Sequence, residues 1–317
     1  VKVCAEEGTH YVDLTGETPF IYKTVKQFQR AALDSKALIV HTSGFDSIPS
    51  DLGAFLAVQR LKQAGGDETF AGPVRTAFKA KGGMSGGTLS SLLTVVEQPK
   101  ESREVASKVY ALSPVQGKHK GRPVVVSSQT FRGQKTWGGF FLMAPINIPV
   151  VNRSWGILES ADPSSRVFRY GPNFVYDEFM ALPGPISSFI ASTVMLLSFG
   201  AIGESHKTAS IHSISPDLLI FACESPTAAL FSPVRWLLRR FGPQAGDGPS
   251  EKERENGWYE VTTVAKSDDG KLESRVVQKG KGDPVSLAGL LNGIGHGQRV
   301  PSASALDLFV TREGLGG

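Results

Sequence analysis

The first sixty residues alternate between short apolar runs and longer amphipathic stretches. Residues 3–8 have the pattern of the end of a helix, with Gly8 as its C-cap. Residues 9–14 (THYVDL) are rich in β-branched and aromatic side chains between two glycines, which predicts a strand. Residues 37–40 (ALIV) form a continuous apolar run, as expected of a strand buried on both faces. Apolar residues at helical spacing follow each run, and Thr18 and Ser47 stand where helix caps are expected. This order of elements predicts a parallel α/β unit over residues 1–60.

The remaining residues, 61–317, have a different pattern. The alternation over 74–80 predicts a half-exposed strand, and a Gly-rich stretch and a helix follow it. Further strands are predicted at 122–127, 137–143, 258–264 and 272–277. The last two flank Asp-Asp-Gly, a strong hairpin signal. Hairpins beside helices predict a second domain of the α+β type with a mixed sheet.

Composition excludes several classes of protein. The 317 residues are 40% apolar and 20% charged, which is compatible with a globular core and not with disorder or a fibre. The two cysteines, Cys4 and Cys223, predict a reducing compartment, and we expect the protein on the cytoplasmic side. The net charge of +4 comes from scattered side chains without an aromatic stacking pattern, so nucleic-acid binding is not expected.

One apolar segment raises the question of membrane contact. Residues 182–203 contain no charge and just reach the length of a membrane span, although Ser, Gly and Pro lower their hydropathy. Residues 234–241 (VRWLLRRF) then form a basic and aromatic stretch of the kind found at lipid interfaces. Either both segments contact a membrane or lipid-droplet surface, or they are ordinary core helices with a solvated basic edge.

Motif searches give one apparent catalytic match. Residues 83–87 (GMSGG) satisfy G-x-S-x-G with Ser85 as the nucleophile, and Asp217 and His296 could complete a triad. The preceding strand is patterned as half-exposed and no oxyanion segment of the HGGG type exists, so a serine hydrolase is the third-ranked hypothesis. The dinucleotide fingerprint is absent, since the near match at 293–297 follows a helical pattern. The six histidines show no metal-ligand spacing, and we expect no metal site.

The candidate binding residues follow the two predicted strands. In open α/β sheets ligands bind beyond the carboxyl ends of the strands, close to helix N-termini. The alternative is that the glycines only form turns and the hydroxyl side chains only cap helices. The residues in question are Thr15, Gly16 and Glu17 after the first strand, and Ser43, Gly44, Phe45 and Asp46 after the second.

Five ordered segments carry a resemblance to a known family: AEEGTHYVDLTGE, IVHTSGFDSIPSDLG, GGMSGGTLSSLL, MAPINIPVVNRS and YGPNFVYDEFM. The chain resembles the saccharopine dehydrogenase-like oxidoreductases, whose relatives include the bacterial trans-acting enoyl reductases. The likeness covers roughly residues 1–180 and resumes at SPVRWLLRRF and GDGPSEKERENGWYEV. It implies an N-terminal Rossmann domain for NAD(P), followed by an α/β domain with a mixed sheet. It also implies that Ser85 belongs to a structural motif.

The chain departs from the family's pattern in three places. The opening strand and Gly-rich phosphate loop, which the resemblance places upstream of Val1, are missing. Residues 204–224 match nothing expected there, and the tail beyond residue 284 replaces an expected Ala-rich helix. We therefore expect an α/β protein with the remnant of a Rossmann-type parallel sheet in residues 1–60, and no appreciable NAD(P) binding by this chain alone.

Two functions from different classes lead the interpretation. The first is an incomplete NAD(P)-dependent oxidoreductase, a reductase acting on a small-molecule or lipid substrate, with the seven candidate residues lining its cofactor cleft. The second is a non-catalytic protein of a membrane or lipid-droplet surface that keeps the fold. No catalytic acid or base is assigned by the sequence, and neither is the oligomeric state.

Overall fold

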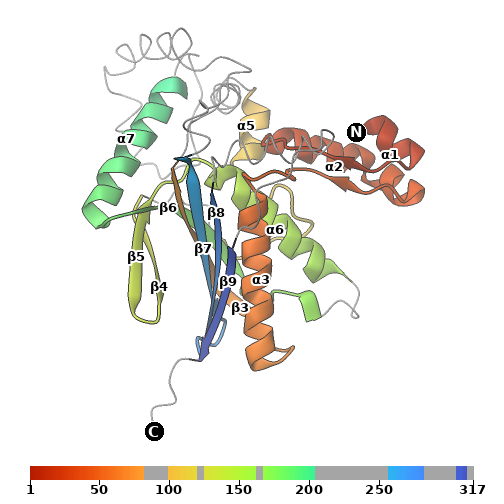
Figure 1. Cartoon of the computed structure of the whole chain (residues 1–317). Helices are drawn as coiled ribbons and strands as arrows, with labels where there is room; N and C mark the ends of the chain where they lie inside the picture. The colour runs from red at the N-terminus through yellow and green to blue at the C-terminus, as the bar shows by residue number, and fades with distance from the viewer. Residues whose placement is uncertain (82–98, 120–124, 162–166, 204–255, 282–304, 313–317) are drawn as a thin grey trace.

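Two β-sheets organise the molecule (Figure 1). The computed structural model describes residues 1–81, 99–119, 125–161, 167–203, 256–281 and 305–312. One sheet is a parallel pair, β1 with β2, and the other has seven strands in the order β4-β5-β6-β3-β7-β8-β9. The predicted fold class is confirmed, because a small parallel sheet precedes a larger mixed sheet and helices accompany both.

The small sheet is built from residues 1–40. Helix α1 (Lys2–Glu7) ends at Gly8, whose φ of 74° lies in the left-handed region as predicted for a C-cap. Strand β1 (Tyr11–Val12) and strand β2 (Ile39–Val40) pair in parallel, and helix α2 (Thr18–Ser35) connects them.

The prediction that the 37–40 strand is buried on both faces is wrong. Val12 and Val40 are 69% and 49% exposed, and Leu38 is 64% exposed. Side chains alternate across a strand, so these residues share the face opposite Tyr11 and His41, whose rings meet at 5.9 Å. No described element covers that outer face.

Helix α3 (Ile48–Gly65) connects the small sheet to the large one. It packs against β3 (Ala71–Lys81), β7 (Trp258–Ser267) and β8 (Leu272–Lys281) of the seven-stranded sheet. The domain boundary predicted near residue 60 stays a prediction.

Of the two predicted helix caps, the position of Ser47 is confirmed and that of Thr18 is wrong. Helix α2 begins at Thr18 itself, with Glu17 at the N-cap, and that cap has no side-chain hydrogen bond. Ser47 occupies the N-cap of α3, but its hydroxyl does not cap that helix. It donates instead to Asn147 Oδ1 at 2.8 Å, so a tertiary partner has replaced the local one.

In the larger sheet, β3 lies at the centre. It runs parallel to β6 (Val175–Leu182) and antiparallel to β7. The other pairings are antiparallel and add β8, β4 (Ser127–Phe131), β5 (Gln134–Gly139) and β9 (Ala305–Arg312). Strand β3 is half-exposed as predicted, since Val74 and Phe78 are buried whereas Arg75 and Lys79 are exposed.

The predicted hairpin at 258–277 is confirmed as β7–β8, with Gly270 at φ 74° in its turn. Two other strand predictions have wrong boundaries. Of the strand expected at 122–127, residues 122–124 lie outside the described residues, and the described strand begins at Ser127. The strand expected at 137–143 ends at Gly139. Helix α6 (Ala144–Ser160) begins after residues 140–143, and the run MAPINIP places Pro145 in its first turn and Pro149 inside it.

The main core lies between the larger sheet and helices α3 and α6. Val74, Val261 and Val276 from the strands are fully buried, and they pack in one cluster with Leu61 of α3 and Trp155 of α6. Two further helices are described, α5 (Lys100–Ala106) beside α2 and α7 (Pro185–Gly203) against β5 and β6.

Helix α7 includes most of the apolar segment noted in the sequence. No helix in the described ranges combines the length and hydropathy needed to cross a membrane. The G-x-S-x-G match with Ser85, the candidate triad partners Asp217 and His296, and the stretches 234–241 and 293–297 lie outside the described residues.

Candidate functional site

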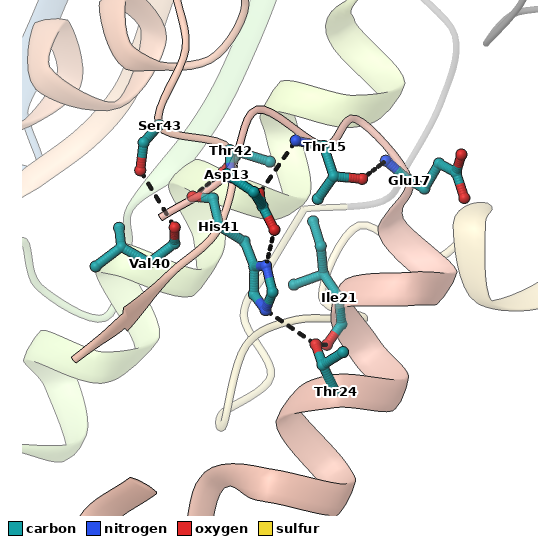
Figure 2. A network of polar contacts seen from close by, with 9 residues as sticks. All are labelled: Asp13, Thr15, Glu17, Ile21, Thr24, Val40, His41, Thr42 and Ser43. Carbon is teal, nitrogen blue, oxygen red and sulfur yellow. Dashed lines mark hydrogen bonds and ion pairs between the residues drawn. The ribbon is translucent and has the colours of Figure 1, made fainter. Parts of the chain in front are cut away.

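The carboxyl ends of β1 and β2 lie side by side, because the strands are parallel and pair Tyr11 with Ile39. Continuing that register by two residues brings Asp13 beside His41, where a polar network forms (Figure 2). Backbone hydrogen bonds also join the two strand ends: Asp13 N donates to Val40 O, and Ser43 N donates to Asp13 O at 2.7 Å.

Asp13 is the centre of this network. Its Oδ1 accepts hydrogen bonds from the backbone N–H groups of Thr15 and Thr42, each at 3.1 Å. Its Oδ2 lies 2.6 Å from His41 Nδ1, and both side chains are largely buried. Burial alone would raise the pKa of Asp13, but the bond with His41 and the two amide donors outweigh it and lower that pKa. The carboxylate therefore holds the turns after both strands.

His41 extends the network toward α2. Its Nε2 lies 2.9 Å from Thr24 Oγ1, and the Thr24 hydroxyl also donates to Ile21 O within the helix. The rings of Tyr11 and Phe20 meet the imidazole edge-on. Since both ring nitrogens already have partners inside the protein, His41 positions the strand ends and is not presented to a ligand.

The turn after β2 is strained. Thr42 has a φ of 55°, which is rare for a β-branched residue and costs roughly 1–3 kcal/mol. The Asp13 bond to its N–H stabilises this conformation, and its own hydroxyl donates to His41 O. Strained backbone of this kind is concentrated at functional sites.

The structure brings together the sequence-predicted residues that follow the two strands. Thr15 Oγ1 accepts a hydrogen bond from Glu17 N, and Ser43 Oγ donates to Val40 O (Figure 2). A Cβ added to Gly44 would come within 2.8 Å of Leu14, so Gly44 packs against the turn after β1. A Cβ added to Gly16 would lie 3.3 Å from Ile146, so this turn also faces helix α6.

The other two predicted residues face different surroundings. The Phe45 ring meets the Tyr259 ring edge-on at 4.6 Å, which makes Phe45 part of the core margin. Asp46 retains contact with solvent, but desolvation by nearby protein atoms raises the pKa of its carboxyl. Of the two, only Asp46 keeps a polar group that a ligand could reach.

A second polar network lies beneath these turns, around Glu178. This fully buried carboxylate accepts hydrogen bonds from Ser50 Oγ at 2.7 Å, Tyr176 OH at 2.8 Å and Asn147 Nδ2 at 2.8 Å. Desolvation raises its pKa to about 7, against the lowering effect of its three donors. Because Ser47 also donates to Asn147, this network anchors the start of α3 to α6 and β6.

Sequence reasoning missed the residues that organise both networks. Asp13 and His41 each interrupt an apolar run at its end, and pairing the two runs in parallel would have placed them together. Glu178 gave no such signal, because an acidic residue in a strand is usually on its exposed face.

Several N–H groups of the described turns are already hydrogen-bonded within the chain and cannot hold a pyrophosphate. A pyrophosphate cradle needs free backbone N–H groups on a Gly-rich turn at a helix N-terminus. The N–H groups of Thr15, Glu17, Thr42 and Ser43 donate to the chain's own oxygens. Among the side chains, the groups that a ligand could meet are the hydroxyls of these turns and the carboxylates of Glu17 and Asp46.

Two other kinds of site can be compared with the strand-end network. The described ranges contain no cluster of three metal-ligating side chains. A polar cavity of about 180 Å³ lies on the sheet face opposite α3 and is lined by residues such as Lys79, Gln129 and Arg275. It includes none of the seven predicted site residues, and the strand-end network is favoured because its geometry follows from the α/β topology.

Comparison with known proteins adds independent evidence. A Mycobacterium tuberculosis protein that is named as a trans-acting enoyl reductase is 31% identical over 292 residues, covering 88% of this chain and 62% of the relative. Trans-acting enoyl reductases of Mycobacterium bovis and Mycobacterium ulcerans are 28% and 29% identical over 286 residues, covering 85% of this chain and 60% of each relative. No family model matches the chain, and no solved structure matches it.

The chain thus spans about three fifths of the length of the curated relatives it matches. Over most of its length the chain is similar to proteins named as trans-acting enoyl reductases, which are oxidoreductases by that name.

Proposed function

We propose that the chain is part of a saccharopine dehydrogenase-like, NAD(P)-dependent reductase that reduces an enoyl group in lipid metabolism. The observation that carries the proposal is the homology over 88% of the chain to a protein named for that activity. The fold is compatible with it, since a parallel strand pair precedes a mixed sheet. The nicotinamide cofactor would supply the hydride.

In this proposal the carboxyl ends of β1 and β2 form one wall of the cleft. Asp13 and His41 hold the two turns in place, and the strained Thr42 fixes the direction in which Ser43 leaves the strand. The groups that would meet cofactor or substrate are the hydroxyls of Thr15 and Ser43 and the carboxylates of Glu17 and Asp46. We assign these turns no role in binding the pyrophosphate.

Cofactor binding tests the proposal directly. We expect no heat of NADPH binding to this chain at sub-millimolar cofactor, and binding once a strand, Gly-rich loop and helix are fused upstream. Glu17→Gln in the fused protein should weaken NADPH or substrate binding, whereas Glu7→Gln on the exposed surface of α1 should not. Micromolar binding by the chain alone would place the cofactor elsewhere and refute the assignment of these turns.

The reductase activity needs a separate measurement. The fused protein should oxidise NADPH when an α,β-unsaturated thioester is added, and Ser43→Ala should slow that reaction. A fluorophosphonate probe should leave the chain unlabelled, and labelling that disappears with Ser85→Ala would favour the hydrolase instead.

A further inference from the structure

Helix α7 has the reverse of the polarity expected for a helix on the surface of a globular domain. Its serines Ser188 and Ser192 are buried at 0% and 1% exposure. Its large apolar side chains are turned outward, with Ile186 at 76%, Phe189 at 56%, Ile190 at 58% and Val194 at 60% exposure. These four positions recur at helical spacing, so they share one face of the helix.

The inverted polarity follows from how α7 contacts the sheet. Ser192 Oγ accepts a hydrogen bond from Phe140 N at 2.7 Å, and Ser188 Oγ donates to Gly184 O. A Cβ at Gly139 would collide with Ser192, which shows that the serine face lies directly on the backbone of β5. Small polar residues permit this close approach, and the large side chains are left on the opposite face.

A cation and an aromatic ring lie beside the start of α7. Trp137 pairs in register with Leu182, three residues before the helix begins, and shares a strand face with Gly139 under the serines. Lys135 places its Nζ 3.8 Å above the Trp137 ring. The β4–β5 hairpin, residues 127–139, carries Arg132 and Lys135 and no acid, and α7 itself carries no charge.

We propose that α7 lies in the plane of an anionic phospholipid surface, with its four outward apolar side chains inserted at the boundary between headgroups and acyl chains. Helices that lie at this depth combine an apolar face with basic and aromatic flanking residues. Here the protein covers the polar face of the helix, and Lys135 and Trp137 supply the flanking groups. Helix α7 does not need to span the bilayer to bind in this way.

A second copy of the chain fits this face less well. Four partly exposed side chains of on the order of 100 Å² each fall well short of the roughly 800 Å² that a stable dimer buries per partner. The basic hairpin would also meet an identical basic hairpin or an uncharged helix. A lipid surface requires less area and offers negative charge to Lys135 and Arg132. Such binding would bring a reductase to an apolar substrate, but it does not depend on the proposed function.

Vesicle flotation of the whole chain tests the proposal without any activity assay. The wild type should float at low salt with phosphatidylcholine vesicles that contain about 30% phosphatidylglycerol, and less well with phosphatidylcholine alone. Phe189→Ser with Ile190→Ser should lower binding to the anionic vesicles by about tenfold or more. Leu33→Ser on α2, an equally exposed apolar residue at 65%, is the matched control and should bind as the wild type does.

Two further readouts locate the contact. Lys135→Gln should weaken binding at low salt and have little effect at high salt, where the charges are screened. Brominated lipids should quench wild-type tryptophan emission more than that of Trp137→Phe. Three results would overturn the proposal: wild type that stays at the bottom of the gradient, a double α7 variant that floats undiminished, or an apolar face that closes a dimer which the double variant dissolves.

Discussion

Replacing Glu178 by glutamine should change how the stability of the protein depends on pH. In the folded chain burial raises the pKa of this carboxyl from 4.5 to about 7. Between those two values the folded state holds a proton that the unfolded state has released. Stability is therefore highest below the unfolded pKa and falls as the pH rises through the folded one.

The size of the effect follows from the shift. Each pKa unit corresponds to about 1.4 kcal/mol, so ionising Glu178 costs on the order of 3 kcal/mol of unfolding free energy above neutral pH. Glu178→Gln resembles the protonated form, keeps the side-chain shape and cannot ionise. Its stability should match the wild type near pH 5 to within about 1 kcal/mol and exceed it at about pH 8.

Urea unfolding followed by tryptophan fluorescence over this pH range measures the difference. Subtracting the two profiles is essential, because the half-buried Asp51 has a pKa raised to about 6 by desolvation and titrates in both proteins. Glu260→Gln is the matched control, since Glu260 is partly exposed and paired with lysines on the other face of the sheet. A wild-type minus Glu178→Gln difference that does not vary with pH would refute the reasoning.

Two further predictions concern the backbone and the strand-end network. Asp13→Asn should lower the unfolding free energy by about 2 kcal/mol, because an amide cannot replace a carboxylate that accepts three hydrogen bonds. The control Asp34→Asn, in an exposed ion pair, should cost less than about 1 kcal/mol, and equal losses in urea titrations would contradict this reasoning. Gly171→Ala should cost about 2–3 kcal/mol by calorimetry, since φ is 104° and the new Cβ would collide with Phe70. Gly66→Ala, at φ 94° in open space, should cost about 1 kcal/mol; equal costs would show that backbone strain, and not the collision, dominates.

Local patterns in the sequence were sufficient for some elements. The spacing of apolar residues predicted α2 and α3, the Asp-Asp-Gly turn predicted the β7–β8 hairpin, and Gly8 predicted the end of α1. In each case the interactions that define the element lie within a few residues of one another. Helix α6 was not predicted, because Pro145 and Pro149 suggest a turn. In the structure Pro145 lies in the first turn of the helix and Pro149 lies inside it.

The site was predictable only in part. The strand order of a parallel unit predicts where the site lies, whereas its hydrogen bonds depend on tertiary contacts. Residues after a strand in a parallel unit lie at the carboxyl edge, and Thr15 and Ser43 do lie there. The link from Asp13 to His41 depends on the register between two strands that are 28 residues apart in the chain. The burial of Glu178 depends on the parallel pairing of β3 with β6, which no local pattern encodes.

The segment from Thr42 to Ser50 joins the two polar networks. Its first residues are held by Asp13, through the N–H groups of Thr42 and Ser43. Its last residues are held from below, where the Ser47 hydroxyl donates to Asn147 and the Ser50 hydroxyl donates to Glu178. Only a few residues separate the two anchors, so a displacement of α3 on the larger sheet must shift the turn after β2. Glu178 and the candidate site are therefore structurally coupled, so that a change at one should shift the other. The coupling is indirect, because no side chain of the candidate site contacts Glu178 in the described network.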